Sequence, residues 1–185
     1  MGEKARLSSA EKTKFMVMAS VTAVIIVICS WITIPMVVPF TLQTFAIFFA
    51  LIFLGGAYGT LSIAVYIILG AIGLPVFSGF KGGLTAITGP TGGYILGFVF
   101  SGLIFWLMTK LLGEKKVVIV ISMITGLTIC YLFGTLWFMH FYAGTDNAKT
   151  FGTVLSLCVI PFIIPDVCKL VLAYVMAGIV KKAVK

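Results

Sequence analysis

The chain has 185 residues, of which 61% are hydrophobic and only 10% are charged. Soluble globular domains carry about 25% charged residues, so this composition excludes an ordinary soluble protein and predicts one integral membrane domain over residues 1–185. The net charge of +8 does not indicate a nucleic-acid-binding protein, because the basic residues flank apolar segments and do not form one patch.

The N-terminal residues 1–14 are polar and basic, and the apolar run after them is long enough to span a bilayer core of about 30 Å. We predict that residues 15–34 form the first transmembrane helix. A cleaved signal peptide fits poorly, because the run is too long and has no small-x-small cleavage site. Ala19 and Ala23 stand four residues apart and give this helix a flat face that another helix can approach closely. Spacing alone does not decide whether that helix belongs to this chain or to a partner.

Pro35 and Pro39 break the apolar run, and Thr41 is suited to cap the helix that follows. We predict helices over residues 42–54 and 60–72, separated by a tight hinge in the glycine-rich stretch 55–59.

A polar loop over residues 74–94 contains six glycines, which let the backbone approach a ligand closely. It does not match a phosphate-binding loop, because its lysine, Lys81, is followed by Gly82. The composition suits a cradle or lid for a small molecule, and a plain connector between two helices remains an equal alternative.

The later apolar segments predict helices over residues 94–112, 117–138 and 165–180, with a short apolar helix or re-entrant piece over 151–160. Pro165 is expected at the first position of the last helix. The N-terminus, the 110–116 turn and the C-terminus hold all of the 13 Lys and Arg except Lys81, Lys149 and Lys169. By the positive-inside rule these three regions are cytoplasmic. The sequence therefore predicts an all-α bundle of six transmembrane helices, with both termini cytoplasmic and the glycine-rich loop between the third and fourth helices facing outward.

Asp166 and Lys169 are an acid and a base inside an apolar helix. Each would cost about 2.5–3.5 kcal/mol if it faced lipid, so both are expected to face the protein interior in the outer half of the membrane. Their i, i+3 spacing places them on one helix face. They are either a ligand-binding pair, the usual role of ionisable residues in a membrane, or a structural pair that satisfies itself.

The sequence does not support catalysis. It has one His, no His-Glu-x-x-His, no paired intramembrane carboxylates and no Gly-x-Ser-x-Gly. The four cysteines have no Cys-x-x-Cys spacing, which argues against zinc and disulfides. The chain is therefore interpreted as a binding protein, with no catalytic residues, no metal and no cofactor.

Four stretches of the chain form a characteristic set: in chain order, residues 38–44 with Gln43, residues 73–77, Gly89-Pro90-Thr91-Gly92-Gly93-Tyr94, and residues 161–169. Together they resemble the BioY family, the biotin-specific substrate-binding components of energy-coupling factor transporters. The resemblance implies a six-helix bundle in a prokaryotic cell membrane that captures biotin on its outer side. It also implies three partner chains, a transmembrane coupling protein and two cytoplasmic ATPases.

The resemblance implies particular residue roles as well. Asp166 and Lys169 match the pair that lines the biotin site of the family, while Ala19 and Ala23 match its small-residue motif that docks the coupling protein. A different vitamin as the ligand, a channel that needs no partner and a membrane enzyme remain alternatives.

The chemistry of biotin suits such a site. Its ureido ring offers two N–H donors and a carbonyl acceptor, which an Asp and a Lys can meet. Its carboxylate suits a cation or the N–H groups of a glycine loop, and Lys81 and Lys149 are the candidate cations.

Overall fold

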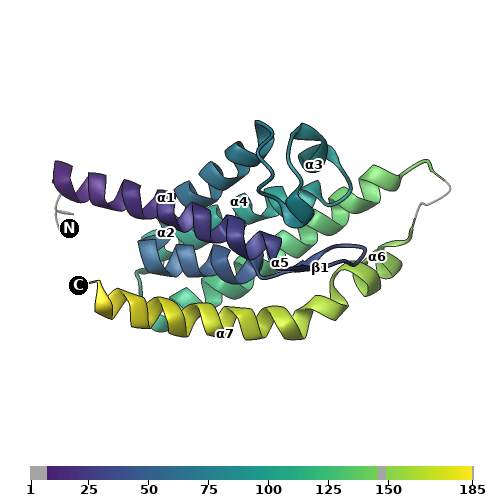
Figure 1. The fold of residues 1–185 in the computed structure, drawn as a ribbon. Helices are drawn as coiled ribbons and strands as arrows, with labels where there is room; N and C mark the ends of the chain where they lie inside the picture. Colours follow the sequence, from purple (N-terminus) through teal and green to yellow (C-terminus); the bar gives the residue numbers. More distant parts are fainter. Residues whose placement is uncertain (1–7, 146–148, 185) are drawn as a thin grey trace.

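The computed structural model describes residues 8–145 and 149–184, which form a bundle of long helices (Figure 1). Over those residues, five helices are long and apolar enough to cross a membrane: α1, α2, α4, α5 and α7. The elements in chain order are α1 (Ser9–Trp31), β1 (Thr33–Ile34), β2 (Phe40–Thr41), α2 (Gln43–Ala71), η1 (Ser78–Phe80), α3 (Leu84–Thr88), α4 (Gly92–Leu112), α5 (Lys116–Tyr142), α6 (Phe151–Cys158) and α7 (Ile160–Ala183).

Helix α1 begins earlier than the apolar run does. The Ser8 side chain accepts a hydrogen bond from the Glu11 backbone N–H, and the Glu11 carboxylate accepts one from the Ser8 N–H. This capping box satisfies two N–H groups that the first helical turn leaves without partners. The helix therefore starts at Ser9, inside the basic segment, and not at residue 15 as predicted.

The fold is mostly helical as predicted, but the segment between α1 and α2 forms a short two-stranded antiparallel hairpin that the sequence did not predict. Thr33 pairs with Thr41, and Ile34 pairs with Phe40. The two prolines of the predicted break lie in the connection between the strands, where no ladder hydrogen bond is required of them. Thr41 does act near the start of the next helix, since its hydroxyl accepts a hydrogen bond from the Gln43 N–H at 3.2 Å.

Helix α2 folds back on itself at Gly55, which confirms the break predicted in this stretch. Gly55 has φ 78° and ψ 168°, a conformation outside the helical region that glycine adopts without strain. On the far side of the break, the Cα of Gly59 lies so close to Leu51 that an added Cβ would be 2.6 Å from the Leu51 Cα. Gln43 and Tyr66, 23 residues apart, are joined by a hydrogen bond of 3.0 Å. The second half of α2 therefore returns alongside the first.

The last long helix corrects another prediction. Helix α7 begins at Ile160 and carries Pro161 in its first turn, while Pro165 lies inside the helix. Proline fits the first turn because its missing N–H would have no helical partner there, and Pro161 takes that position in place of Pro165. An internal proline removes one helical hydrogen bond and bends the helix, and Figure 1 shows α7 bent near its start.

The glycine-rich segment between α2 and α4 is folded against the bundle. It contains η1 and α3, and Val76 and Phe77 within it are buried. The Ser30 hydroxyl donates to the Val76 carbonyl at 2.5 Å, and the Trp31 indole N–H donates to the Pro75 carbonyl at 2.9 Å. The C-terminal end of α1 therefore holds the segment in place.

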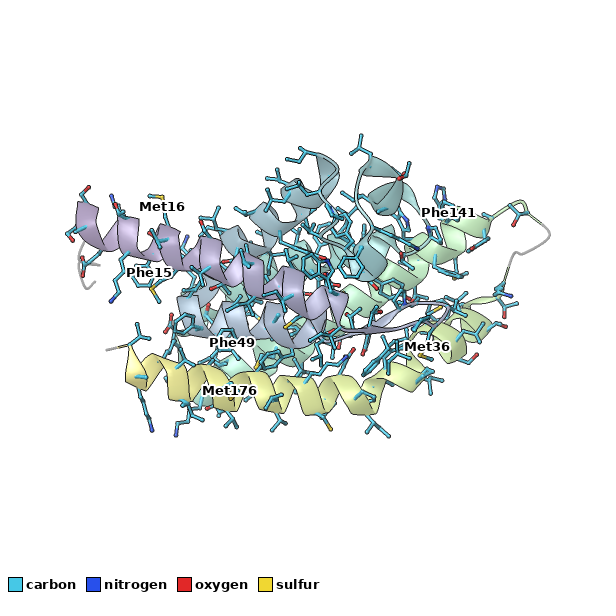
Figure 2. The ribbon with its side chains drawn as sticks, viewed as in Figure 1. Phe15, Met16, Met36, Phe49, Phe141 and Met176 are labelled. Atoms are coloured by element: carbon cyan, nitrogen blue, oxygen red, sulfur yellow. The ribbon has the colours of Figure 1, made fainter. Side chains whose placement is uncertain are left out.

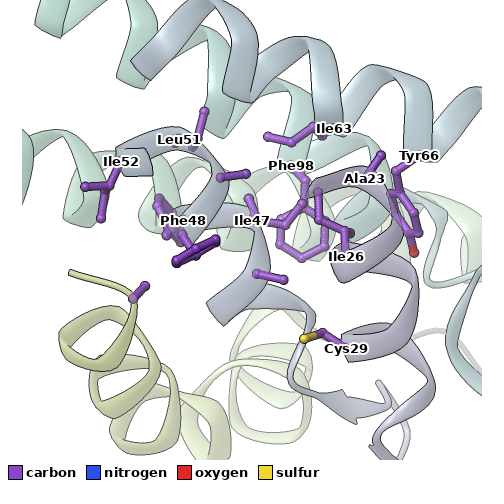
Figure 3. Close-up of a cluster of buried hydrophobic side chains, with 14 of the residues drawn as sticks. Ala23, Ile26, Cys29, Ile47, Phe48, Leu51, Ile52, Ile63, Tyr66 and Phe98 are labelled. Carbon is purple, nitrogen blue, oxygen red and sulfur yellow. The ribbon is translucent and has the colours of Figure 1, made fainter. Parts of the chain in front are cut away.

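The apolar core lies between α1, both halves of α2, α4, α5 and α7. Figure 3 shows Ala23 and Ile26 of α1 among core side chains of α2 and α4, which include Ile63 and Phe98. Ala19 and Ala23 are only 2% and 1% exposed, so their flat face packs inside this chain. This burial fits the self-packing alternative, while docking of a partner helix at these two residues stays a prediction.

The start of α1 and the end of α7 lie at the same end of the bundle (Figure 1). Gly55, Glu114 and Lys181 line one small surface depression, so the α2 fold-back and the α4–α5 turn share that end. Figure 2 shows Phe15 near this end and Met36, in the connection of the hairpin, near the other. We call the first end the lysine-rich end, since it carries Lys12, Lys14, Lys110, Lys115, Lys116, Lys181 and Lys182.

Candidate functional site

A cavity of about 440 Å³ opens at the end opposite the lysine-rich end. This volume lies in the range of small-molecule sites, about 300–1,000 Å³. Its walls come from the β-hairpin connection, both halves of α2, the segment 77–91, α4, α5, α6 and α7. Elements from most of the chain therefore meet around one space.

Asp166 and Lys169 lie on the cavity wall and are 3% and 6% exposed, which confirms that both face the interior. The Lys169 ammonium donates to Asp166 Oδ1 at 2.8 Å. The opposite face of α7 exposes Ile164 and Val167 to the surroundings of the bundle. The i, i+3 spacing thus turns the ion pair inward and the aliphatic side chains outward.

Two aromatic residues complete the surroundings of this pair. The Tyr131 hydroxyl on α5 donates to Asp166 Oδ2 at 2.5 Å. The Lys169 ammonium also lies 3.8 Å from the centre of the Phe40 ring, a cation–π contact contributed by β2. The carboxylate thus has a protein donor on each oxygen, and the ammonium has two partners. We call Tyr131, Asp166 and Lys169 the polar triad.

The polar triad is electrically almost neutral, because one positive and one negative group lie in direct contact. Each carboxylate oxygen can accept a second hydrogen bond, and the ammonium has further N–H groups. A bound molecule could therefore meet both donors and acceptors here without breaking the pair. Such a surface suits an uncharged polar group that itself carries donors and an acceptor.

A second polar contact borders the cavity where the two halves of α2 meet. The Gln43 amide donates to the Tyr66 hydroxyl at 3.0 Å, and both side chains are buried. Apolar and aromatic side chains form much of the rest of the wall, including Val38, Phe77, Phe98, Leu127 and Phe162. The cavity thus combines a few fixed polar groups with apolar walls, the usual composition of a ligand site.

The residues of the glycine-rich motif at the start of α4 have two different roles: some line the cavity, and others allow close packing of helices. Gly89, Pro90, Thr91 and Tyr94 line the cavity, whereas Gly92 and Gly93 do not. A Cβ on Gly92 would collide with the Ile87 carbonyl, and one on Gly93 would collide with the Trp137 side chain. These two glycines permit close packing, and neither needs to contact a ligand for that role.

Of the candidate cations for a ligand carboxylate, Lys81 lines the cavity and is exposed, while Lys149 is not part of the lining. Over residues 8–145 and 149–184, no group of three or more His, Cys, Asp or Glu side chains could hold a metal ion.

Sequence reasoning missed Tyr131, Phe40 and Tyr66. Tyr131 carried a weak signal, since it lies in the middle of an apolar helix, where a buried hydroxyl normally has a hydrogen-bond partner. Phe40 and Tyr66 gave none, because their roles depend on the hairpin and on the fold-back of α2.

A family model described as the BioY family matches residues 3–185. The chain belongs to the BioY family. One BioY relative, the biotin transporter BioY of Thermotoga maritima, is 40% identical over 171 residues, which cover 90% of this chain and 95% of the relative. The probable biotin transporter BioY of Pyrococcus horikoshii is 43% identical over 140 residues, 76% of this chain and 78% of the relative.

A solved structure has a similar fold. A crystal structure of the S-component for biotin from an ECF-type ABC transporter matches with a TM-score of 0.83 at 26% identity. The match covers 96% of this chain and 95% of the solved chain.

Proposed function

We propose that this chain is the biotin-binding subunit of an ECF-type transporter and takes up biotin through the cavity described above. The observation that carries the proposal is the polar triad, a buried ion pair with a tyrosine donor that faces a ligand-sized cavity in a member of the BioY family. The chain is a transport subunit, not an enzyme, so it binds and releases its ligand unchanged.

Biotin matches the two kinds of wall in this cavity. The carboxylate of Asp166 can accept from a ureido N–H, and the ammonium of Lys169 can donate to the ureido carbonyl, while the protein contacts of both remain. The thioether ring and the aliphatic chain suit the apolar walls. Gln43, Gly89, Pro90, Thr91 and Tyr94 are the further residues that we expect near the ligand.

We also propose six membrane crossings, with the two halves of α2 counted separately, and both termini in the cytoplasm. The fold-back at Gly55 supports this number, and the lysine-rich end supports the direction under the positive-inside rule. The cavity then opens on the outer side of a prokaryotic cell membrane, where it can capture biotin before transport.

Transport against a gradient requires a source of energy. We propose that a transmembrane coupling protein and two cytoplasmic ATPases provide it. The solved protein with a similar fold belongs to an ECF-type ABC transporter, which supports this class of partner. Because Ala19 and Ala23 are buried in this chain, we do not assign the docking of the coupling protein to them.

Calorimetric titration of the detergent-purified chain tests the proposal directly. We expect biotin to bind with one site per chain, and riboflavin, thiamine and folate to give no heat of binding. Binding of another vitamin with biotin inert would assign a different substrate. Turnover of any of these compounds by the purified chain would contradict the assignment as a transport subunit.

A further inference from the structure

We infer that biotin binds with its uncharged ring system at the polar triad and its carboxylate at the cavity mouth beside Lys81, so that amide-linked biotin derivatives are ligands as well. This inference rests on the proposed function, and it adds the orientation of the ligand and the class of compounds accepted. The charges of the wall, the backbone around Lys81 and the exposure of the mouth support it in turn.

The distribution of charge along the cavity favours one orientation. Asp166, Lys169 and Lys81 are the charged residues among the described residues that line it. A carboxylate placed at the polar triad would lie beside the Asp166 carboxylate, and like charges in a buried site repel strongly. At Lys81 the same carboxylate meets a cation that makes no ion pair with any described residue. The carboxylate is therefore better accommodated at Lys81.

The backbone holds Lys81 in place from both sides. On one side the Phe77 N–H donates to the Lys81 carbonyl at 2.9 Å, and on the other the Gly83 N–H donates to the Gly70 carbonyl at 2.7 Å. Between them Gly82 lies so close to the Leu74 carbonyl that no side chain would fit at this position. The side chain of Lys81 is therefore exposed, but its backbone is held in place by the surrounding segment.

The turn that leads into Lys81 also contains an unfavourable backbone conformation. Phe80 has φ 57°, and it is the non-glycine residue with positive φ in the described part of the chain. This left-handed conformation costs a non-glycine residue about 1–3 kcal/mol, so its surroundings must hold it. The Phe80 ring lies 5.0 Å from the Trp31 ring, at the end of α1. That contact supports the turn that leads into Lys81, a lining residue of the cavity.

The exposure of the wall residues shows where the cavity opens. Met36, Val37, Lys81 and Thr85 are exposed, whereas Asp166, Lys169, Tyr66 and Phe98 are buried. A group attached to the carboxyl carbon of biotin would therefore project past the exposed residues toward water. Amide conjugates such as biotin methylamide and Nε-biotinyl-lysine keep the ring system and change only this outer end.

The first experiment measures the affinities of the wild-type chain for biotin, biotin methylamide and Nε-biotinyl-lysine by calorimetric titration. Because an exposed ion pair contributes little, we expect both amides to bind within about tenfold of biotin. A loss of more than tenfold for either amide would overturn the inference, since it would place the carboxylate in a closed part of the cavity. Failure of biotin itself to bind would instead contradict the proposed function.

The second experiment compares Lys81→Met with Lys149→Met, an exposed lysine outside the cavity lining. We expect Lys81→Met to lower the affinity for biotin about two- to fivefold and to leave the affinity for biotin methylamide unchanged. At high salt, the variant and the wild type should bind biotin with the same affinity, because salt screens an exposed charge. Lys149→Met should change neither affinity. The role of Lys81 would be overturned if Lys81→Met lowered the affinities for biotin and for biotin methylamide equally. It would also be overturned if Lys149→Met lowered the affinity for biotin as much as Lys81→Met does. An unchanged affinity of Lys81→Met for biotin would do the same.

Discussion

The Tyr131 hydroxyl on α5 donates a hydrogen bond to the Asp166 carboxylate on α7, a residue 35 positions later in the chain. This bond connects two helices that cross the bundle, and it fixes one oxygen of the carboxylate while Lys169 fixes the other. The orientation of the carboxylate toward the cavity is therefore set before any ligand arrives, which reduces the ordering that binding requires.

Tyr131→Phe removes this bond and keeps the ring. We expect a loss of about tenfold in biotin affinity, because the carboxylate becomes free to rotate and keeps a single protein donor. Titration of the purified variant measures the loss. Tyr58→Phe is the control, since the Tyr58 ring stacks on Phe15 near the lysine-rich end, and its affinity should equal that of the wild type. Equal biotin affinities of the two variants would show that the Tyr131 hydroxyl does not contribute to biotin binding.

Asp166→Asn and Lys169→Met each leave one buried charge without its partner. Breaking a buried ion pair in this way typically costs about 3–5 kcal/mol, so we expect a clearly lower thermal midpoint for each single variant. The double variant, Asp166→Asn with Lys169→Met, should recover much of that stability and still fail to bind biotin. Thermal unfolding and titration of all three variants check this. A double variant that binds biotin like the wild type would assign the pair a purely structural role.

Ala19→Leu and Ala23→Leu place larger side chains where the chain is already packed. Overpacking typically costs about 1–3 kcal/mol, so both variants should unfold at lower temperature than the wild type. Val24→Leu on the same helix is the matched control, because Val24 is 55% exposed, and its stability should not change. Normal stability of the alanine variants, combined with loss of co-purification with a coupling protein, would restore the docking role inferred from the sequence.

Gly93→Ala introduces a Cβ that would overlap the Trp137 side chain. The Trp137 indole also donates to the Gly89 carbonyl at 2.9 Å, so a displaced Trp137 would disturb a residue of the cavity wall. We expect a lower thermal midpoint together with weaker biotin binding. Gly152→Ala, where an added Cβ meets no atom within 4 Å, should change neither quantity. A stable Gly93→Ala variant with normal affinity would contradict this packing role.

Local features of the sequence predicted much of this fold. The apolar runs predicted the long helices, the glycines at residues 55–59 predicted the fold-back, and the i, i+3 spacing predicted that Asp166 and Lys169 share a buried face. Each of these depends on residues close together in the chain. The hydrophobic pattern in a membrane identifies helices well, because lipid-exposed backbone must satisfy its own hydrogen bonds.

The sequence could not predict features that depend on distant residues. The spacing of Ala19 and Ala23 indicated a flat face, but only the fold shows that the face turns inward. The start of α7 was placed too late, because either Pro161 or Pro165 could occupy a first helical turn. Tyr131 joins the site only through contact between α5 and α7, and no local pattern reports such a contact.

The cavity wall is drawn from residues as far apart as Met36 and Lys169. A ligand in this space therefore contacts segments that would separate when the chain unfolds, and it binds only the assembled form. At a concentration one hundred times its dissociation constant, such a ligand adds about 2.7 kcal/mol to the free energy of unfolding. Cells starved of biotin would thus hold this subunit in its less stable form, more open to membrane proteases, so the supply of the vitamin would influence the lifetime of the protein that captures it.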